Sequence, residues 1–383
     1  MLTKNIGYKN FLQKSKVNTI KKDLDLLVKK SILSQSLKTT YKYSYKKKLI
    51  SKFKNIFNIR IIGMGGSILG AEAIYRFLKH KIKKKFTFVS NLLSSKEIKV
   101  NKRNTVNLII SKSGNTLETI VSSNILLKSK NNIFISEKQN NYLNILANQI
   151  RSDVIEHKNY IGGRYSILSE VGMLPAELMG LNEAKFKKLN YLINNKKFVN
   201  NLIQNVSNTL NFIKKGKNLS VVLNYDYKSK SLFDWYQQLI AESLGKKSKG
   251  ILPIISTMPK DNHSLMQFYL DGPKKSFYTF FYVHDKKQTK IRSERLLSSA
   301  DYLKGKDLKN IIYSQKIATE NIFRNKKIPF RSFEVLNRNE QSLGELFTFF
   351  ILETILLGRA LNVNPFDQPA VELIKKETKK ILI

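Results

Sequence analysis

The stretch at residues 107–119 constrains the fold of this chain more than any other part of the sequence. An apolar run of strand type at 108–110 passes through small and polar residues into a helix-like pattern that starts at Leu117. At such a turn the first helix amides lack intrahelical partners, and the helix dipole adds partial positive charge. We therefore expect a parallel α/β fold in which this turn binds an anion such as phosphate.

Side chains of this first anion turn strengthen that interpretation. Ser111, Ser113 and Thr116 offer hydroxyl donors, and Lys112 can contribute a full positive charge. Gly114 lets the backbone approach a ligand closely. The same residue types also favour the N-cap of a helix that follows a buried strand, so this stretch alone is compatible with either role.

A second turn of the same kind occurs at residues 58–70. Gly63, Gly65 and Gly66 permit a tight turn with exposed amides, and Ser67 can cap the following helix while donating to a ligand. The spacing resembles a dinucleotide fingerprint. However, the last glycine falls at the wrong interval, and no acidic ribose partner ends a clear second strand.

Strand-like and helix-like segments alternate along the whole chain, which predicts doubly wound parallel sheets with helices on both faces, in three α/β/α layers. The expected strands lie at 86–90, 108–110, 132–135, 219–223, 250–255, 277–283 and 328–335, and the clearest helices at 198–213, 231–244 and 342–361. Ligands of such sheets bind beyond the carboxyl ends of the strands, where both turns emerge. Two anion turns on one edge indicate a single phosphorylated ligand.

The length of 383 residues and the hydrophobic content of 42% are enough for two cores. We expect a Lys-rich helical segment at 1–50 that packs on the exterior of the first domain. The first α/β domain would span 51–205, and the second, with the C-terminal helices, would span 206–383.

Composition excludes several classes of protein. The chain has no cysteine, so disulfides and thiolate metal sites are excluded. The first 22 residues have no apolar core of signal-peptide length, and the apolar run at 347–357 is interrupted by Glu353. We expect a soluble, cytoplasmic protein without a membrane partner.

The formal charge of +40 would ordinarily suggest a nucleic-acid or membrane partner. Here the basic residues are mostly lysines spread along the whole length, and the denser runs contain few of the arginines favoured in base readout. No zinc-finger or leucine-zipper pattern is present. We therefore expect no nucleic-acid partner.

Two further stretches carry residues that could take part in binding or catalysis. Gly162 and Gly163 place Arg164 immediately before a helix expected to start at Ser166, which favours an arginine facing a cleft over the commoner solvated one. Gln238 and Glu242 are four apart on one helix face, although most helical glutamates are surface charges.

The last candidates lie near the C-terminus. His263 follows a Met-Pro break, and a lone histidine is more often structural than catalytic. Gln368 and Lys375 are seven apart, which places both on one helical face if the helix begins that early.

Taken together, these stretches resemble the glucose-6-phosphate isomerase (phosphoglucose isomerase) family over about residues 59–375. The resemblance rests on six motifs in order: Gly-Met-Gly-Gly-Ser at 63–67, Ser-Lys-Ser-Gly-Asn-Thr at 111–116, Gly-Gly-Arg-Tyr-Ser at 162–166, Gln-Leu-Ile-Ala-Glu-Ser at 238–243 with Gly245-Lys246, His-Ser at 263–264 and Asn-Pro-Phe-Asp-Gln-Pro-Ala-Val-Glu-Leu at 364–373 with Lys375. The last motif is the most restrictive.

The resemblance implies that Ser67, Ser111, Lys112, Ser113 and Thr116 bind the phosphate of a hexose 6-phosphate. It further implies that the reaction interconverts glucose 6-phosphate and fructose 6-phosphate through an enediolate.

For the chemical step, the resemblance implies that Glu242 moves a proton between C2 and C1 and that Arg164 stabilises the enediolate. Gln238 and Gln368 would orient the sugar.

His263 and Lys375 would assist ring opening. In this family the histidine comes from the neighbouring subunit, which implies a homodimer.

Two departures from the family pattern concern the sugar contacts. Asp261 and Asn262 stand where the family has Gly-Gln, and a proline follows Gln368 where many members have tryptophan. These changes leave open an isomerase that also accepts mannose 6-phosphate. A non-catalytic sugar-phosphate regulator is the other alternative, although residues 1–50 lack a convincing helix-turn-helix.

No cofactor is expected, because an aldose-ketose interconversion has no net redox change. The reaction needs only a base, groups that stabilise the negative charge on the enediolate oxygens, and an acid-base pair that opens the sugar ring. No cluster of His, Asp and Glu has the spacing of metal ligands, so we expect no metal.

Overall fold

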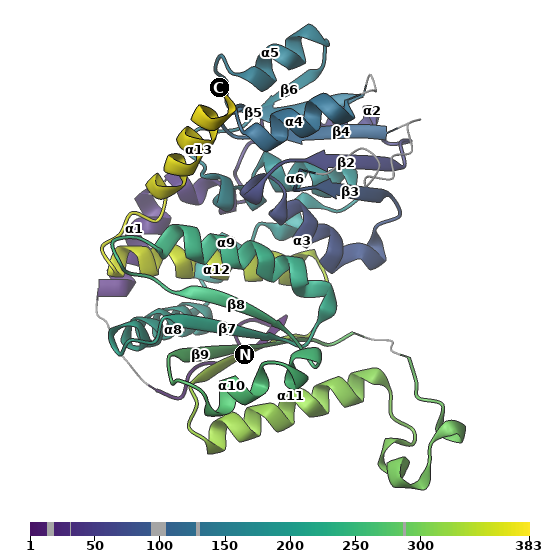
Figure 1. Ribbon diagram of the computed structural model, residues 1–383, viewed down its shortest axis with the longest axis vertical. Coiled ribbons are helices and arrows are strands. Elements are labelled where there is room, and N and C mark those ends of the chain that lie inside the picture. The colour runs from purple at the N-terminus through teal and green to yellow at the C-terminus, as the bar shows by residue number, and fades with distance from the viewer. Residues whose placement is uncertain (14–18, 31, 93–104, 128–130, 286–288) are drawn as a thin grey trace.

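The computed structural model describes residues 1–13, 19–30, 32–92, 105–127, 131–285 and 289–383, and within them the chain forms two five-stranded sheets (Figure 1). The first sheet is entirely parallel and has the order β3-β2-β4-β5-β6. Its strands are β2 (Asn58–Ile62), β3 (Lys85–Val89), β4 (Thr105–Ile110), β5 (Asn132–Ser136) and β6 (Asp153–Glu156).

The second sheet has the order β1-β10-β9-β7-β8 and is parallel except for its edge strand β1. Its strands are β1 (Ile6–Lys9), β7 (Leu219–Asn224), β8 (Leu252–Thr257), β9 (Ser276–Val283) and β10 (Phe330–Val335). The two sheets confirm the expected α/β class.

The helices form a layer between the sheets and cover their outer faces (Figure 1). Between the sheets lie α3 (Leu69–Leu78), α6 (Glu170–Leu178), α9 (Lys230–Leu244) and α12 (Glu340–Ala360). The first sheet is covered outside by α4 (Leu117–Leu126) and α5 (Tyr142–Gln149), and the second by α10 (Met266–Asp271) and α11 (Leu308–Asn325). The other helices are α1 (Thr19–Lys30), α2 (Lys47–Lys52), α7 (Leu189–Ile193), α8 (Lys196–Lys214) and α13 (Pro369–Leu382).

Successive side chains of each strand point to opposite faces of the sheet, and this alternation explains why helices cover both faces. Leu108 and Ile110 of β4 join the large core cluster between the sheets, while Ile109 joins the cluster under α4 and α5. In β7, Val222 faces the inner cluster and Val221 the outer one. Because successive side chains of a strand point to opposite faces, both sheets bury apolar residues on each side.

The connections place a topological switch point between β2 and β4 of the first sheet. The chain leaves β2 for β3 on one side, and β4 then adds on the other side of β2. Ligands of open α/β sheets bind beyond the carboxyl ends of the strands at such a switch point. Both anion turns follow these two adjacent strands, β2 and β4.

The N-terminal segment differs from the expected exterior helices of the first domain. Residues Ile6–Lys9 form β1, which pairs antiparallel with β10 of the second sheet, and α1 packs against α8 and α12. The expected helices are present as α1 and α2, but the position of α1 was wrong and the strand was missed, since four residues are too few to give a periodic signal. By contrast, α2 does pack on α6. The domain boundaries at residues 50 and 205 stay a prediction.

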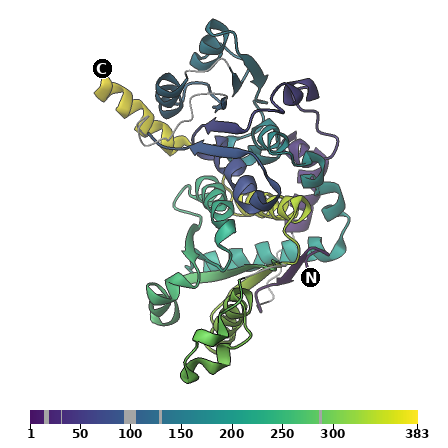
Figure 2. The same ribbon diagram turned by 90° about the vertical axis from the view of Figure 1, so that its right-hand side faces the viewer.

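The C-terminal helix α13 extends away from the rest of the molecule (Figure 2). None of its residues is buried, although Val371, Ile374 and Ile381 are apolar. Among the described residues, no helix combines the length and the apolar character needed to cross a membrane.

Candidate active site

The two anion turns and the arginine loop meet at the switch point because glycines let their backbones come close. A Cβ atom at Gly63 would lie 2.8 Å from the carbonyl oxygen of Ile110, at the end of β4. A Cβ atom at Gly66 would lie 2.3 Å from the carbonyl carbon of Gly163, beside Arg164. These separations are too short for any side chain. The three loops therefore assemble only with glycine at these positions.

The first turns of α3 and α4 lack side-chain caps, which suits an anion site. Thr116 is the N-cap of α4, but its hydroxyl is hydrogen-bonded to that of Ser111 at 2.9 Å instead of capping the helix. Ile68 is the N-cap of α3, which begins at Leu69. Our expectation that Ser67 caps this helix was wrong, since a short 3-10 helix at Gly65–Ser67 comes first. Both helix N-termini thus keep backbone amides that no side chain caps.

The two polar side chains in the middle of the first anion turn have protein partners. Lys112 donates from Nζ to the carbonyl of Asn159 at 2.8 Å and is 3.4 Å from a carboxylate oxygen of Glu137. Ser113 is exposed, and its hydroxyl accepts from the Asn115 amide at 3.3 Å. Lys112 would have to change partners to contact a phosphate.

One face of α9 supplies the central side chains. Trp235, Gln238 and Glu242 recur at intervals of three and four residues, which places them on one face of the helix. The Trp235 indole donates to the carbonyl of Arg164 at 3.1 Å. Gln238 donates from Nε2 to Glu242 Oε2 at 2.9 Å. A Cβ atom at Gly65 would lie 2.6 Å from that Gln238 nitrogen, so this face of α9 lies against the glycine-rich turn.

Arg164 is the centre of the site. It lies in a 3-10 helix at Gly163–Leu168, and α6 starts only at Glu170, so the helix expected at Ser166 begins later. Arg164 is 3% exposed; its guanidinium donates four hydrogen bonds, and Nη1 also forms an ion pair with Glu242. Nε donates to Ser243 Oγ at 2.8 Å, Nη1 is 2.9 Å from both Gln368 Oε1 and Glu242 Oε1, and Nη2 donates to the carbonyls of Pro365 at 2.8 Å and Asp367 at 2.9 Å.

These contacts limit what Arg164 can do for a ligand. Each guanidinium nitrogen already contacts at least one protein oxygen, so a new oxygen at Nη1 would compete with Gln368 or Glu242. The Nη1 partners are side chains, whereas the Nη2 partners are backbone carbonyls. Gln368, being neutral, is the acceptor that a negatively charged oxygen would displace most readily.

An unpaired acceptor lies beside the pair of Gln238 and Glu242. Gln238 Oε1 is buried and has no hydrogen-bond partner among the described residues. Buried polar atoms without partners are rare and cost stability, so this oxygen is suited to accept a hydrogen bond from a ligand hydroxyl group.

Three residues that we did not single out as site residues hold this arrangement together. Ser243 and Tyr165 have hydroxyls 2.8 Å apart, and Tyr165 Oη also donates to the Pro365 carbonyl at 3.0 Å. Burial raises the pKa of Tyr165 to about 12, so its hydroxyl stays protonated at neutral pH. Lys246 pairs with Asp367 at 2.8 Å, and this contact lowers the pKa of Asp367. All three residues were present in our motifs, but their contacts depend on the fold.

Two expected site residues lie elsewhere. His263 is exposed in a 3-10 helix at Lys260–His263, which follows β8, and no contact of the described chain joins it to Glu242. Lys375 lies on α13 and donates to Glu372 at 2.6 Å. Gln368 precedes α13 with φ −154°, ψ 64°, so it does not share a helical face with Lys375 as we had expected.

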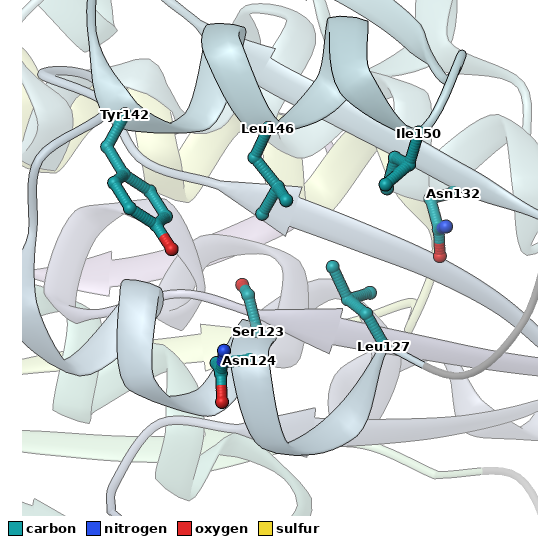
Figure 3. A pocket seen from close by; sticks show the side chains of 7 residues that line it. All are labelled: Ser123, Asn124, Leu127, Asn132, Tyr142, Leu146 and Ile150. Carbon is teal, nitrogen blue, oxygen red and sulfur yellow. The ribbon is translucent and has the colours of Figure 1, made fainter.

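A separate cavity of about 310 Å³ lies between the C-terminal end of α4 and α5 (Figure 3). It is lined by Ser123, Asn124, Leu127, Asn132, Tyr142, Leu146 and Ile150. Asn132 starts β5, so the cavity lies at the opposite end of α4 from the anion turn.

The chain is similar to known proteins over most of its length. The family model for phosphoglucose isomerase matches residues 38–257. The glucose-6-phosphate isomerase of Methanocaldococcus jannaschii is 32% identical over 349 residues, which cover 85% of each chain. That of Mycoplasmopsis pulmonis is 30% identical and is matched over 84% of this chain and 82% of its own.

Solved structures share the fold. A hypothetical protein from Thermus thermophilus has a TM-score of 0.83 at 21% identity, with 95% of this chain and 94% of the other covered. A glucose-6-phosphate isomerase from Chlamydia trachomatis has a TM-score of 0.74 at 17% identity, with 95% and 83% covered. Since the family model matches more than half of the sequence and both relatives match over four fifths of it, the chain belongs to the phosphoglucose isomerase family.

Proposed function

We propose that this chain is a glucose-6-phosphate isomerase, which interconverts glucose 6-phosphate and fructose 6-phosphate in glycolysis and gluconeogenesis. The observation that carries the proposal is the carboxylate of Glu242. Arg164 and Gln238 hold it against the glycine-rich turn, beside two helix N-termini that can bind phosphate.

The substrate phosphate binds at the N-termini of α3 and α4. Backbone amides and the hydroxyls of Ser67, Ser111 and Thr116 supply the donors, and the two helix dipoles favour the negative charge. Ser113 and Lys112 join them once Lys112 leaves its present partners.

Glu242 is the base that takes the proton from C2 and returns it to C1. Its contacts with Arg164 Nη1 and Gln238 Nε2 fix the direction of the carboxylate, which is what proton transfer requires. The unpaired Oε1 of Gln238 accepts a hydrogen bond from a sugar hydroxyl. As negative charge develops on the enediolate oxygens, one oxygen replaces Gln368 at Arg164 Nη1.

Ring opening uses His263 and Lys375, with His263 supplied by a second copy of the chain. The topology supports this assignment. Glu242 lies near the end of α9, which leads back to the start of β8, whereas His263 follows the other end of that strand. A six-residue strand spans roughly 20 Å, which is too far for direct cooperation within one chain. Lys375 reaches the sugar only if α13 lies differently from its position here.

The homodimer is tested by mixing inactive subunits. Combined His263→Ala and Glu242→Gln subunits should regain activity, because one hybrid site keeps both groups. Each parent homodimer stays impaired. Verified subunit exchange without recovery would exclude donation of His263 across the interface.

The isomerase itself is tested with purified protein and three sugars in parallel: glucose 6-phosphate, fructose 6-phosphate and mannose 6-phosphate. We expect the first two to interconvert, with solvent deuterium entering C2 of the glucose product. Formation of mannose 6-phosphate would extend the substrate range, while absence of any interconversion would refute the function. We also propose a cytoplasmic location, where hexose 6-phosphates are made and consumed.

A further inference from the structure

Tyr165 and Ser243 form a closed hydrogen-bond ring with Arg164. Ser243 is fully buried, Tyr165 is 5% exposed, and neither is assigned a step in the proposed reaction. Their hydroxyls lie 2.8 Å apart; Ser243 accepts from Arg164 itself, and Tyr165 donates to the Pro365 carbonyl, which also accepts from Arg164. They therefore act on Arg164 and not directly on a substrate.

The donor directions in this ring follow from the contacts. Tyr165 Oη gives its proton to the Pro365 carbonyl at 3.0 Å, so it accepts from Ser243 Oγ. Ser243 Oγ in turn accepts from Arg164 Nε at 2.8 Å, and Arg164 Nη2 donates to the same Pro365 carbonyl at 2.8 Å. Each hydroxyl therefore has one donor and one acceptor role, and the ring admits a single set of proton positions.

The ring fixes the plane of the guanidinium. The group is flat and rigid, so holding Nε and Nη2 also sets the direction of Nη1. Nη1 is the nitrogen that contacts Glu242 and Gln368. A donor that is already oriented stabilises developing charge without reorganising at the moment of reaction.

We propose that Tyr165 and Ser243 are positioning residues that fix the Arg164 guanidinium, so that Nη1 faces the base and the developing enediolate. This inference rests on the proposed isomerase function. It predicts that loss of either hydroxyl impairs turnover more than substrate binding, because the phosphate turns are not touched.

The test uses Ser243→Ala and Tyr165→Phe in the full-length protein, with Tyr236→Phe as the matched control. Tyr236 is also a buried tyrosine, on α9, and its hydroxyl accepts from another buried arginine, Arg331, at 3.1 Å. We expect kcat to fall roughly tenfold in Ser243→Ala, about 1.4 kcal/mol, and several-fold in Tyr165→Phe, with KM within about twofold. The control should lose stability but keep kcat.

The double variant should be no slower than Ser243→Ala alone, because both hydroxyls act through one chain of bonds. Unchanged kcat in both single variants of an active enzyme, or an equal fall in the Tyr236→Phe control, would overturn the inference. Exchange of the Arg164 Nε proton, followed by NMR of arginine-labelled protein, gives a readout that does not depend on activity. The ring predicts slow exchange that becomes fast in Ser243→Ala.

The outcomes separate the two proposals. A wild-type protein with slow Arg164 Nε exchange but no isomerase activity would refute the function and leave the ring itself intact. An active wild type whose Nε proton exchanges equally fast with and without Ser243 would refute the ring and leave the function intact.

Discussion

Replacing Glu242 by Gln removes the basicity of the central carboxylate and keeps its shape. A positioned general base contributes roughly 10²–10⁴-fold, so kcat should fall by that factor, equivalent to about 2.7–5.5 kcal/mol. Affinity should change little, because the two anion turns, at which we propose that the phosphate binds, precede α3 and α4 and not α9.

The structure indicates that this variant will fold. Arg164 Nη1 keeps an oxygen acceptor at position 242, and exchanging a charged acceptor for a neutral one costs about 1 kcal/mol. The new amide nitrogen would face Gln238 Nε2, but Gln238 can turn over and present its unpaired Oε1 instead. The turned amide then places its Nε2 where Oε1 now has no partner, so one buried polar atom of Gln238 lacks a partner, as it does in the wild type.

The assay measures interconversion of the two sugar phosphates, deuterium entry at C2 and, separately, binding of a hexose-phosphate analogue by calorimetry. Asp234→Asn is the control, because Asp234 lies on the same helix and pairs with Lys230 at the surface at 3.0 Å. The control should retain full turnover. Full turnover in Glu242→Gln with an intact fold would refute the assignment of the base.

Three further predictions test other parts of the structure. Replacing both Ser111 and Thr116 by Ala removes two hydroxyl donors to a charged acceptor, each worth ~1.5–3 kcal/mol. Binding of phosphate-bearing analogues, measured by calorimetry, should therefore weaken by more than tenfold. Unchanged binding would place the phosphate elsewhere. Gly66→Ala should destabilise the fold by ~1–3 kcal/mol in urea unfolding, whereas Gly163→Ala, whose Cβ would meet nothing within 4 Å, should not. Burial lowers the pKa of Lys187 to about 7, whereas the ordinary pKa of a lysine is near 10.4. Folding therefore releases the Lys187 proton at pH values between these two pKa values. The free energy of unfolding should rise with pH across that window, because the unfolded chain binds more protons there. Urea unfolding at pH 7 and 9.5 should therefore show wild type gaining about 3 kcal/mol relative to Lys187→Met, and an equal pH dependence of the two proteins would contradict that shift.

The sequence by itself determined the local elements. A helix was predicted at 231–244 and is found at Lys230–Leu244, and the strand predicted at 277–283 is Ser276–Val283. Periodicity is a property of neighbouring residues, so it can be read without knowing the fold. The two anion turns and the pairing of Gln238 with Glu242 follow for the same reason, because spacing along one helix or one turn fixes their geometry.

Only the tertiary structure decided which distant groups meet. The five oxygens around the Arg164 guanidinium come from α9 and from residues 365–368, and no local pattern indicates that these segments meet there. The same holds for β1, whose four residues become a strand because β10 offers an unpaired edge. His263 and Lys375 lie away from Glu242 because their positions depend on long-range packing of β8 and α13, which local spacing does not encode. Local spacing therefore specified the two turns and the pairing of Gln238 with Glu242, and packing specified how Arg164 is held between them.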